Sequence, residues 1–381
     1  MESGSHAPCV VDTFTAKWAL ADAAEPQATI SQGVAEMRQF RSVRRVCFGV
    51  ALAMLAMLIG LFGATTTVSA MPSTVFGPPK EVSKVTLADT SIDGPALWTS
   101  SSGSVRAELA WTGTDAAHHL NVMTSSDGIH YSGKVILSDT SSLGPGVARY
   151  GADVSDNTVI AWIGTDRNRT LNVWDGVPLH GYTKLTLWGE NSFTSPAIAT
   201  TGGGDLYLVW AGTDSGHSLN IAHIIARGGM SLDWKVTLSK FHSPASPSLV
   251  YDPNTHQLLL SWITGDNHIH FAMSPDGKTW TEPAGSPIHQ LSDVGPWMSG
   301  FDGNNMPRYF VTWRGTDAAH SVNVRYTESF PNWPLEGNQS TLDESSFGGP
   351  VVGYVGGARQ TLIAWTGTDA AHHLNLAVIG V

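Results

Sequence analysis

From about residue 80 onward, short apolar runs alternate with polar turns in a pattern that recurs six times. Each copy contains four strand-like segments: the first follows a proline, the second ends at a tryptophan, the third follows a Gly-Thr-Asp-type turn, and the fourth has the form Lys-x-x-Leu in its clearest copies. The marker tryptophans are Trp111, Trp162, Trp210, Trp262, Trp313 and Trp365, which stand 48 to 52 residues apart. A repeat of this length with four short strands is typical of a β-propeller blade.

The two ends of the repeat region predict how a ring would close. The sixth copy stops at Val381 after its third strand, whereas a spare fourth strand, Val82–Leu87, stands before the first copy. Pairing the two removes exposed sheet edges, which otherwise promote aggregation. The sequence therefore predicts an all-β fold, a six-bladed β-propeller of four-stranded blades, in which an N-terminal strand at about 81–88 completes the last blade. A solenoid is the alternative, and it would leave that strand unpaired.

An apolar run over residues 46–64 precedes the repeats, with four arginines upstream of it and small residues ending at Ala70 downstream. These features predict a signal peptide or a signal-anchor helix. The segment upstream of Met37 is too long for an ordinary signal, so Met37 is expected to be the true start. The expected division is residues 1–36 disordered or not translated, 37–70 signal peptide or anchor, 71–80 linker, and 81–381 propeller. Both alternatives export the propeller, as a secreted or extracytoplasmic protein that meets a membrane only through its apolar segment.

Charge and cysteine content narrow the function classes. Residues 1–71 hold five basic and five acidic side chains, so the whole net charge of −11 belongs to the repeat region. An acidic domain of this kind disfavours binding to nucleic acid, which needs a basic face. Both cysteines, Cys9 and Cys47, precede the repeats, which excludes a disulfide or thiol chemistry within them.

The Trp-x-Gly-Thr-Asp hairpin offers a structural role for each of its residues. Trp111 can pack between neighbouring blades, and Gly113 is expected to adopt a positive φ at the turn. Asp115 can accept backbone N–H bonds in an Asx turn. His118 is close enough in sequence to pair with Asp115, and Asn121 is expected to bond across the joint between blades.

The same hairpins also support a functional interpretation, in which six clusters ring one face of the disc. Tryptophan offers a stacking surface for a sugar ring, while Asp, Asn and His side chains bond hydroxyl groups, and repetition of weak sites raises avidity. The candidate ligand-binding residues are Trp111, Asp115, His118, Asn121, Asp166, Arg169, Asp214, His217, Asp266, His268, His270, Asp317, His320, Asp369 and His372. One Asp and one or two His residues per hairpin are too few for zinc, so neither a metal nor another cofactor is expected.

Two blades depart from the common hairpin. Blade two has Arg167-Asn168-Arg169 where other copies have Ala and His, and blade four has a shorter hairpin with His270 where the others have Asn. If one pocket is special, these blades are expected to border it. The alternative is sequence drift without functional meaning.

Two turns carry a resemblance to a known family. They read Ser274-Pro-Asp276-Gly277-Lys-Thr-Trp280 in blade four and Ser125-Ser-Asp127-Gly128-Ile-His-Tyr131 in blade one. Both resemble the Asp-box, or BNR repeat, of the sialidase (neuraminidase) superfamily, with one residue fewer between Asp and Gly. The resemblance covers the blade plan from about residue 80 onward and implies a six-bladed propeller. In that family the Asp-box is a structural turn away from the active site, so it transfers no catalytic role.

A sialidase activity would imply three arginines that grip a carboxylate, a Tyr nucleophile with a Glu partner, and an Asp acid/base. The segment that normally supplies the first arginine reads Ile92-Asp93-Gly94-Pro95 here. Other arginines that remain as members of a triad are Arg106, Arg227, Arg308, Arg314, Arg325 and Arg359, with Tyr326, Glu328 and Tyr354 as further candidates. None matches a catalytic motif, so the catalytic residues are left unassigned.

The favoured function is therefore an exported, sialidase-like propeller that acts as a non-catalytic module for binding glycans or glycoconjugates. One alternative is a sialidase-type glycoside hydrolase with a rearranged pocket. Another is a structural or protein-interaction disc whose hairpins serve only the fold.

Overall fold

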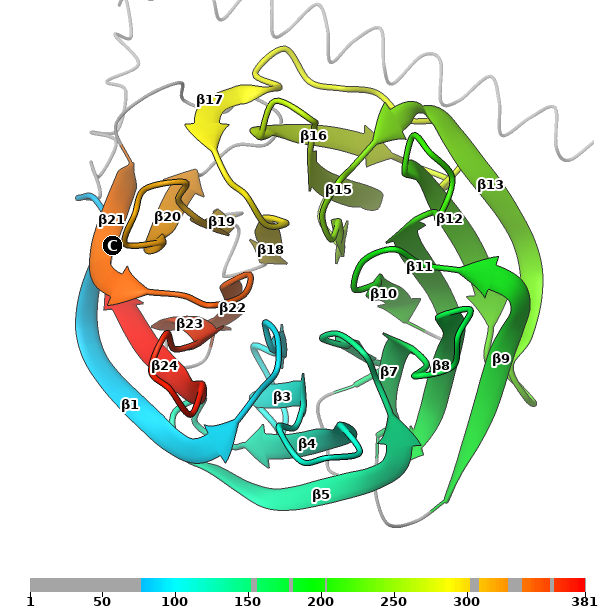
Figure 1. Cartoon of the computed structure of the whole chain (residues 1–381), viewed down its shortest axis with the longest axis horizontal. Coiled ribbons are helices and arrows are strands. Elements are labelled where there is room, and N and C mark those ends of the chain that lie inside the picture. The colour runs from blue at the N-terminus through cyan, green and yellow to red at the C-terminus, as the bar shows by residue number, and fades with distance from the viewer. Residues whose placement is uncertain are drawn as a thin grey trace, which may run out of the picture. The chain divides into compact units, whose positions relative to one another are not determined.

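The computed structural model describes residues 77–151, 156–177, 181–202, 204–301, 308–327, 338–356 and 360–380. These residues belong to the second of two compact units, Thr74–Val381. They form six four-stranded antiparallel sheets arranged around a central axis (Figure 1). The predicted six-bladed β-propeller is thus confirmed. The described residues contain no helix long and apolar enough to cross a membrane, and the predicted leader lies outside them.

The two inner strands of each blade begin where the sequence pattern places them. The innermost strands, each of which starts directly after a proline, are β2 (Ala96–Thr99), β6 (Gly146–Arg149), β10 (Ala197–Gly202), β14 (Ser248–Asp252), β18 (Trp297–Phe301) and β22 (Val351–Val355). The second strands, which contain the marker tryptophans, are β3 (Ala107–Thr112), β7 (Thr158–Ile163), β11 (Asp205–Ala211), β15 (Gln257–Ile263), β19 (Arg308–Arg314) and β23 (Gln360–Thr366). Proline suits a strand start because no ladder donor is lost there.

The two outer strands follow the hairpin. The third strands are β4 (His119–Ser125), β8 (Thr170–Val177), β12 (Ser218–Ile225), β16 (His268–Ser274), β20 (Ser321–Thr327) and β24 (His373–Gly380). The outermost strands are β5 (Tyr131–Thr140), β9 (Gly181–Asn191), β13 (Ser231–His242), β17 (Ile288–Leu291), β21 (Gln339–Ser345) and β1 (Lys80–Thr90). Strand β17 is short and lacks the Lys-x-x-Leu form.

The ring is closed by strand β1, which pairs antiparallel with β24 and completes blade six (Figure 1). The register runs from Lys80 opposite Gly380, through Val85 opposite Leu376, to Thr90 opposite His373. This pairing joins the start of the propeller to its end. The prediction that the first strand completes the last blade is confirmed.

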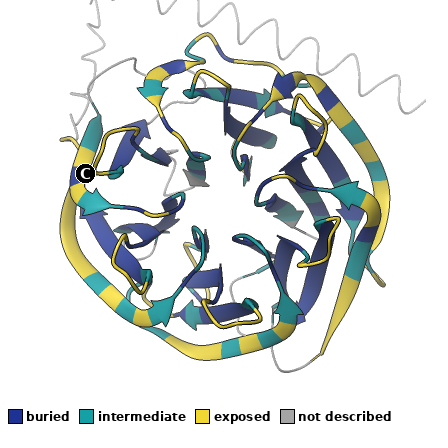
Figure 2. Ribbon diagram, in the orientation of Figure 1, coloured by how far each residue is buried: buried dark blue, intermediate teal, exposed yellow. Residues whose placement is uncertain are grey.

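The hydrophobic core lies between neighbouring blades and leaves the outermost strands half exposed (Figure 2). Each marker tryptophan is at most 1% exposed and packs against the blade that precedes it. Trp111 of blade one, for example, contacts a cluster that includes Leu362 and Leu376 of blade six. Burial of a Trp side chain is among the largest single contributions to a core. The predicted packing of these residues between blades is confirmed.

Candidate functional site

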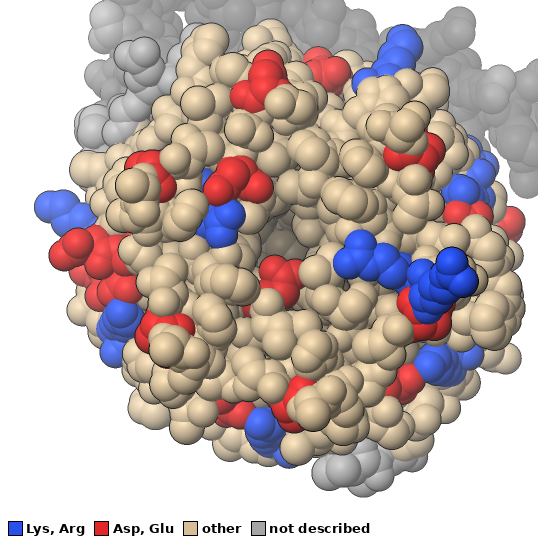
Figure 3. All heavy atoms as spheres, in the orientation of Figure 1, with Lys and Arg blue, Asp and Glu red and all other residues tan. Residues whose placement is uncertain are grey.

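The six hairpins between second and third strands lie on one face of the ring, together with the loops that lead into the innermost strands. In blade one the N–H of Ile92, in such a loop, donates to the carbonyl of Thr112 at the end of the second strand, at 3.1 Å. Figure 3 shows this face, which is hollowed at its centre and carries acidic and basic side chains around the rim. We call it the hairpin face.

The carboxylate of Asp115 stabilises the hairpin turn to which it belongs. Asp115 Oδ1 accepts the N–H of Ala117 at 3.1 Å, Oδ2 accepts the N–H of His119 at 3.1 Å, and Oδ1 lies 2.7 Å from His119 Nδ1. Asp369 repeats this arrangement with His373, whose Nδ1 lies 2.8 Å from Oδ1. The prediction that His118 pairs with Asp115 is therefore wrong, because the next residue, His119, is the partner.

The backbone of the turn explains that difference. His118 has a φ of +59°, and the corresponding residues in the other five hairpins also have positive φ: Arg169, His217, Asn267, His320 and His372. Gly113 has no positive φ, so that prediction is wrong as well. A Cβ at Gly113 would lie 2.8 Å from Asp115 Oδ2 and 2.9 Å from Asn121 Nδ2. Glycine stands there because two polar side chains occupy the space of a Cβ.

The repeated asparagine bonds within its own blade. Asn121 Nδ2 donates to the carbonyl of His119 at 2.8 Å. In blade two Asn172 Oδ1 accepts the hydroxyl of Thr186, on the outermost strand of the same blade, at 2.8 Å. The prediction that this asparagine bonds across the joint between blades is wrong, because the nearest donors belong to the same sheet.

The remaining candidate residues of the hairpins are spread over separate blades. His217 and His372 lie against Phe193 and Phe347, with ring centroids 4.1 and 4.2 Å apart. His268 Nδ1 lies 3.1 Å from an oxygen of Asp266. Other neighbouring pairs are Ser218 with Asp214 (3.1 Å), Ser321 with Asp317 (2.9 Å), His320 with Asp293 (3.6 Å), His270 with Glu282 (3.3 Å) and Arg169 with the carbonyl of Phe193 (3.2 Å). The hairpins are therefore stabilised by repeated local side-chain contacts, and ligand binding by these residues stays a prediction.

The environment of the hairpin carboxylates favours their charged form. Slight burial raises the pKa of Asp115, but hydrogen bonds from His119 and Ala117 outweigh it and hold the pKa below its ordinary value. The pKa of the aspartate is lowered in all six hairpins, and bonds from Thr264 and His268 bring the pKa of Asp266 to about 2.

Each marker tryptophan is covered instead of exposed. Trp111 is 1% exposed, and Lys134 of its own blade lies 5.2 Å from the centroid of its indole ring. The same lysine forms an ion pair with Asp89 of blade six. The stacking surface that the sequence suggested at Trp111 is therefore closed to a sugar by the lysine and by the core.

This arrangement of tryptophan, lysine and acid recurs at four joints of the described structure. The lysines are Lys84, Lys134, Lys184 and Lys235, which lie over Trp365, Trp111, Trp162 and Trp210 and pair with Glu344, Asp89, Asp139 and Glu190 of the preceding blade. Blade four has Phe241 of blade three stacked on Trp262 at 4.6 Å instead. The joint between blades four and five carries an amide pair, Gln339 with Gln290, at 3.1 Å.

At the joint between blades one and two, a large aromatic side chain stands exposed on the outermost strand. Trp188, on the outermost strand β9, is 84% exposed. The corresponding positions, four residues after each repeat lysine, are Ala88, Ser138 and Ser239. Trp188 lines a cavity of about 510 Å³ with Asp139 and Thr140 of blade one and with polar residues of blade two, namely Asp166, Asn168, Thr170, Asn172, Lys184 and Thr186. We call this cavity the joint cavity.

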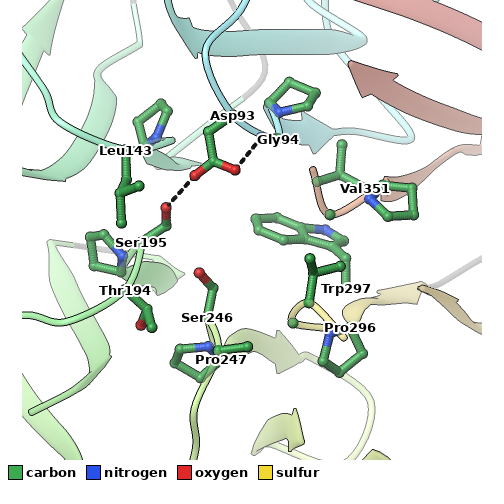
Figure 4. A pocket seen from close by; sticks show the side chains of 18 of the residues that line it. Asp93, Gly94, Leu143, Thr194, Ser195, Ser246, Pro247, Pro296, Trp297 and Val351 are labelled. Atoms are coloured by element: carbon green, nitrogen blue, oxygen red, sulfur yellow. Dashed lines mark hydrogen bonds between the residues drawn. The ribbon is translucent and has the colours of Figure 1, made fainter. Parts of the chain in front are cut away.

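A second cavity of about 250 Å³ lies on the axis of the hairpin face, lined by the loops before the innermost strands (Figure 4). Asp93 lines this cavity: one oxygen accepts the N–H of Gly94 at 2.7 Å, and the other accepts the N–H of Gly144 at 2.9 Å and the hydroxyl of Ser195 at 3.1 Å. The indole of Trp297 lies across the cavity. Asp93 thus ties together the loops of blades one, two and three.

Among the residues that the structure describes, no cluster of arginines of the kind that a sialidase site needs lies on the axis. A further axial cavity lies deeper and shares Trp297 with the first, and among the described residues neither cavity is lined by an arginine. Arg149 is buried and forms an ion pair with Glu108. Burial raises the pKa of Glu108, and the neighbouring guanidinium only partly offsets this effect. Glu328 and Arg359 lie outside the described residues.

The turns that resemble the Asp-box lie at the ends of the third strands, on the face opposite the hairpins. Asp127 Oδ1 accepts the N–H groups of Ile129 and His130, both at 2.8 Å. Asp276 accepts the N–H groups of Lys278 and Thr279 in the same way, at 2.8 and 2.7 Å. Both carboxylates therefore hold a turn, in line with a structural role.

Comparison with known proteins supports the fold. No protein-family model and no curated protein matches the chain. A fungal lectin of Aleuria aurantia, described as a six-bladed propeller that recognises fucose, has a TM-score of 0.57 at 9% identity, over 78% of this chain and 96% of the lectin. A Dyadobacter fermentans protein of unknown function has a TM-score of 0.57 at 12% identity, over 80% of this chain and 99% of that protein. Trypanosoma rangeli sialidase has a TM-score of 0.51 at 13% identity, over 80% of this chain and 58% of the sialidase. The chain is thus a six-bladed propeller of the architecture found in lectins and sialidases.

Sequence reasoning missed the residues that make one joint unlike the rest. Of the candidate residues from the hairpins, Asp166 lines the joint cavity, whereas Trp188, Lys184 and Asp139 were not singled out. Alignment of the outermost strands was the available signal, because a tryptophan stands in blade two where the three sister blades with the repeat lysine have Ala or Ser.

Proposed function

We propose that the protein is an exported glycan-binding module and that its ligand binds in the joint cavity between blades one and two. The observation that carries the proposal is Trp188, whose indole is 84% exposed beside hydroxyl, amide and charged groups. A sugar ring presents an apolar face that stacks on an aromatic ring and a rim of hydroxyls that needs donors and acceptors.

The polar groups of the joint cavity are held in place before a ligand arrives. Lys184 pairs with Asp139 and lies 5.0 Å from the centroid of Trp162, and Thr186 bonds Asn172. An ammonium group has three protons and a carboxylate about four lone-pair sites, so each retains capacity for a sugar hydroxyl. Preorganised groups of this kind reduce the entropy cost of binding.

The axial cavity is a weaker candidate for the glycan site. The carboxylate of Asp93 already accepts three bonds from three loops, and Trp297 packs against core clusters of several blades. Both residues therefore have a structural explanation. Trp188 has none, because its ring faces solvent on the outside of the last strand of its blade.

A glycan array followed by calorimetry tests the function. The expected result is binding of at least one glycan with one site per chain, because the exposed tryptophan occurs in blade two and not at the equivalent positions Ala88, Ser138 and Ser239. Trp188→Ala is expected to weaken binding at least about tenfold and to leave the unfolding free energy within about 0.5 kcal/mol. Leu232→Ala, at a 43% exposed outer-strand position of blade three, is the matched control and is expected to bind normally.

An array without any bound glycan would contradict this function. Binding unaffected by Trp188→Ala would show that the site lies elsewhere on the ring.

The proposal of export rests on the apolar segment at 46–64 and is tested separately, by N-terminal sequencing of the protein recovered from the medium. A chain retained in the cytoplasm with residues 1–36 intact would contradict it.

A further inference from the structure

The joint cavity adjoins a smaller cavity of about 320 Å³ at the edge of the ring. The smaller cavity is lined by Ile136, Trp174 and Tyr182, among others, and it shares Ser138 and Asp139 with the joint cavity. The two cavities therefore lie next to each other between the outermost strands β5 and β9, on either side of the ion pair of Lys184 with Asp139. We call the two together the joint groove.

One side of strand β9 supplies an alternating row of side chains along the joint groove. Tyr182 lines one cavity, and Lys184, Thr186 and Trp188 line the other. Alternate residues of a strand point to the same side, and six residues of strand span about 20 Å. The row is therefore longer than a single sugar ring.

The row has an aromatic ring at each end. Tyr182 is 55% exposed, and its ring lies 5.6 Å from that of Trp174, which is buried in the core and supports it from below. Ile136 on β5 is also exposed and faces the same cavity. Trp188 stands at the other end. Two separated aromatic platforms suit a ligand with apolar ring faces at more than one point along its length.

The middle of the joint groove is polar and slightly acidic. Lys184 is matched by Asp139, and Thr186 donates to Asn172. Asp166 is also charged, and it accepts the N–H groups of Asn168 and Thr170 of its own turn at 3.0 and 3.1 Å. The groove therefore offers hydroxyl-binding groups without the excess positive charge that would select an anionic ligand.

We infer that the joint groove binds an internal stretch of a neutral, linear glycan, with one sugar ring on Tyr182, another on Trp188, and hydroxyls of the intervening rings on Lys184 and Asp139. This inference rests on the proposed glycan-binding function and adds the class of glycan and the direction in which it lies. A site for a single terminal sugar would need only the Trp188 end.

Calorimetry with oligosaccharides of increasing length tests the inference. The probes are the cello-, laminari- and xylo-oligosaccharide series, from the monosaccharide to the hexasaccharide, titrated into the full propeller. In the series that binds, affinity is expected to rise at least about tenfold between the disaccharide and the hexasaccharide. Tyr182→Ala is expected to remove this gain and to leave disaccharide affinity within about twofold. Trp188→Ala weakens every length, and Leu232→Ala changes none.

The outcomes separate the inference from the function on which it rests. If affinity is already complete at one or two sugars and Tyr182→Ala behaves like Leu232→Ala, the groove inference is wrong while glycan binding stands. Binding confined to anionic or branched glycans on the array, with silence in all three linear series, also overturns it. Silence toward every glycan removes both proposals. Far-ultraviolet circular dichroism of each variant confirms that the propeller is folded.

Discussion

The ammonium group of Lys184 lies 5.0 Å from the centroid of the Trp162 indole ring. The same lysine forms an ion pair with Asp139 of the neighbouring blade. The lysine thus shields the buried tryptophan from solvent and connects two sheets that are not hydrogen-bonded to each other as strands. Three other joints repeat the relationship with Lys84, Lys134 and Lys235. The Lys-x-x-Leu pattern of the outermost strand therefore has a physical cause at the joints between blades.

Replacing Lys235 tests this joint without disturbing the proposed glycan site. Lys235→Met keeps much of the apolar stem and removes the charge that lies over Trp210 and pairs with Glu190. The unfolding free energy is expected to fall by about 0.5–1 kcal/mol, since both interactions are partly exposed to solvent. Urea unfolding followed by Trp fluorescence measures the change. Lys240→Met, an exposed lysine of the same strand outside this arrangement, serves as control, and an equal loss in both variants would contradict the role of the joint.

Removal of strand β1 tests the closure of the ring. A chain that starts at residue 91 lacks the partner of β24 and exposes that edge, so it is expected to aggregate or to dimerise through it. A chain that starts at residue 77 retains β1 and is expected to remain monodisperse. Size-exclusion chromatography with light scattering distinguishes the two. A monodisperse chain from residue 91 with a normal melting temperature would show that closure contributes little.

The carboxylate of Asp115 is expected to stabilise its hairpin turn. Asp115→Ala removes the acceptor for Ala117 and His119, and the unfolding free energy is expected to fall by about 0.5–1 kcal/mol because the turn is exposed. Glycan binding in the joint groove is expected to stay unchanged. Calorimetry and urea unfolding on one preparation measure both. Lost binding with unchanged stability would instead support the ring of hairpin sites that the sequence suggested.

Acid is expected to weaken the propeller through the same carboxylates. Their pKa values are lowered in the folded state, so their contribution to stability is fully present above about pH 4, the ordinary carboxyl pKa of an unfolded chain. It is lost as the pH falls toward about 2, the pKa of Asp266. Glu81, Glu108 and Asp175 shift in the opposite direction and are fewer. Urea midpoints at pH 5, 4 and 3 are expected to decrease in that order, with a shallower decrease in the double variant Asp115→Asn/Asp369→Asn.

Trp297 is expected to hold the axis of the ring together. Its indole lines both axial cavities and packs against core clusters of the surrounding blades. Trp297→Ala merges the two cavities and is expected to lower the unfolding free energy by about 3 kcal/mol, whereas Trp297→Phe costs less. Glycan affinity is expected to be unchanged, because the joint groove lies at the outer edge. A loss of binding in Trp297→Ala with a stable fold would place the ligand on the axis.

The architecture was predictable because each blade repeats the same local sequence signals. Pro95 and its counterparts mark strand starts, Trp111 and its counterparts stand one residue before the ends of the second strands, and the strand around Val85 closes the ring. These features depend on period-two patterning, on turn residues and on the number of strand-like segments. Each of them can be recognised in short stretches of the sequence without knowledge of tertiary contacts.

The details of the hairpin were less predictable because they depend on which atoms share a small volume. The sequence shows two adjacent histidines, but only the backbone geometry makes His118 the residue with positive φ and turns His119 toward Asp115. The sequence likewise predicts a positive φ for Gly113. The structure shows instead that glycine is needed there because the side chains of Asp115 and Asn121 occupy the space of a Cβ.

The sequence by itself determined the number of blades, their strand order, the closing strand and the acidic character of the domain. Only the tertiary structure decided which polar and aromatic residues share a surface, because the joint groove is built from β5 and β9, whose contacting residues Asp139 and Lys184 are 45 positions apart. Trp111, which the sequence offers as a stacking surface for a sugar, is buried beneath Lys134, whereas Trp188, which no repeat motif contains, is exposed. Repetition specifies the scaffold, whereas the proposed site arises where one blade departs from its sisters, at a joint that forms only when two neighbouring blades pack together.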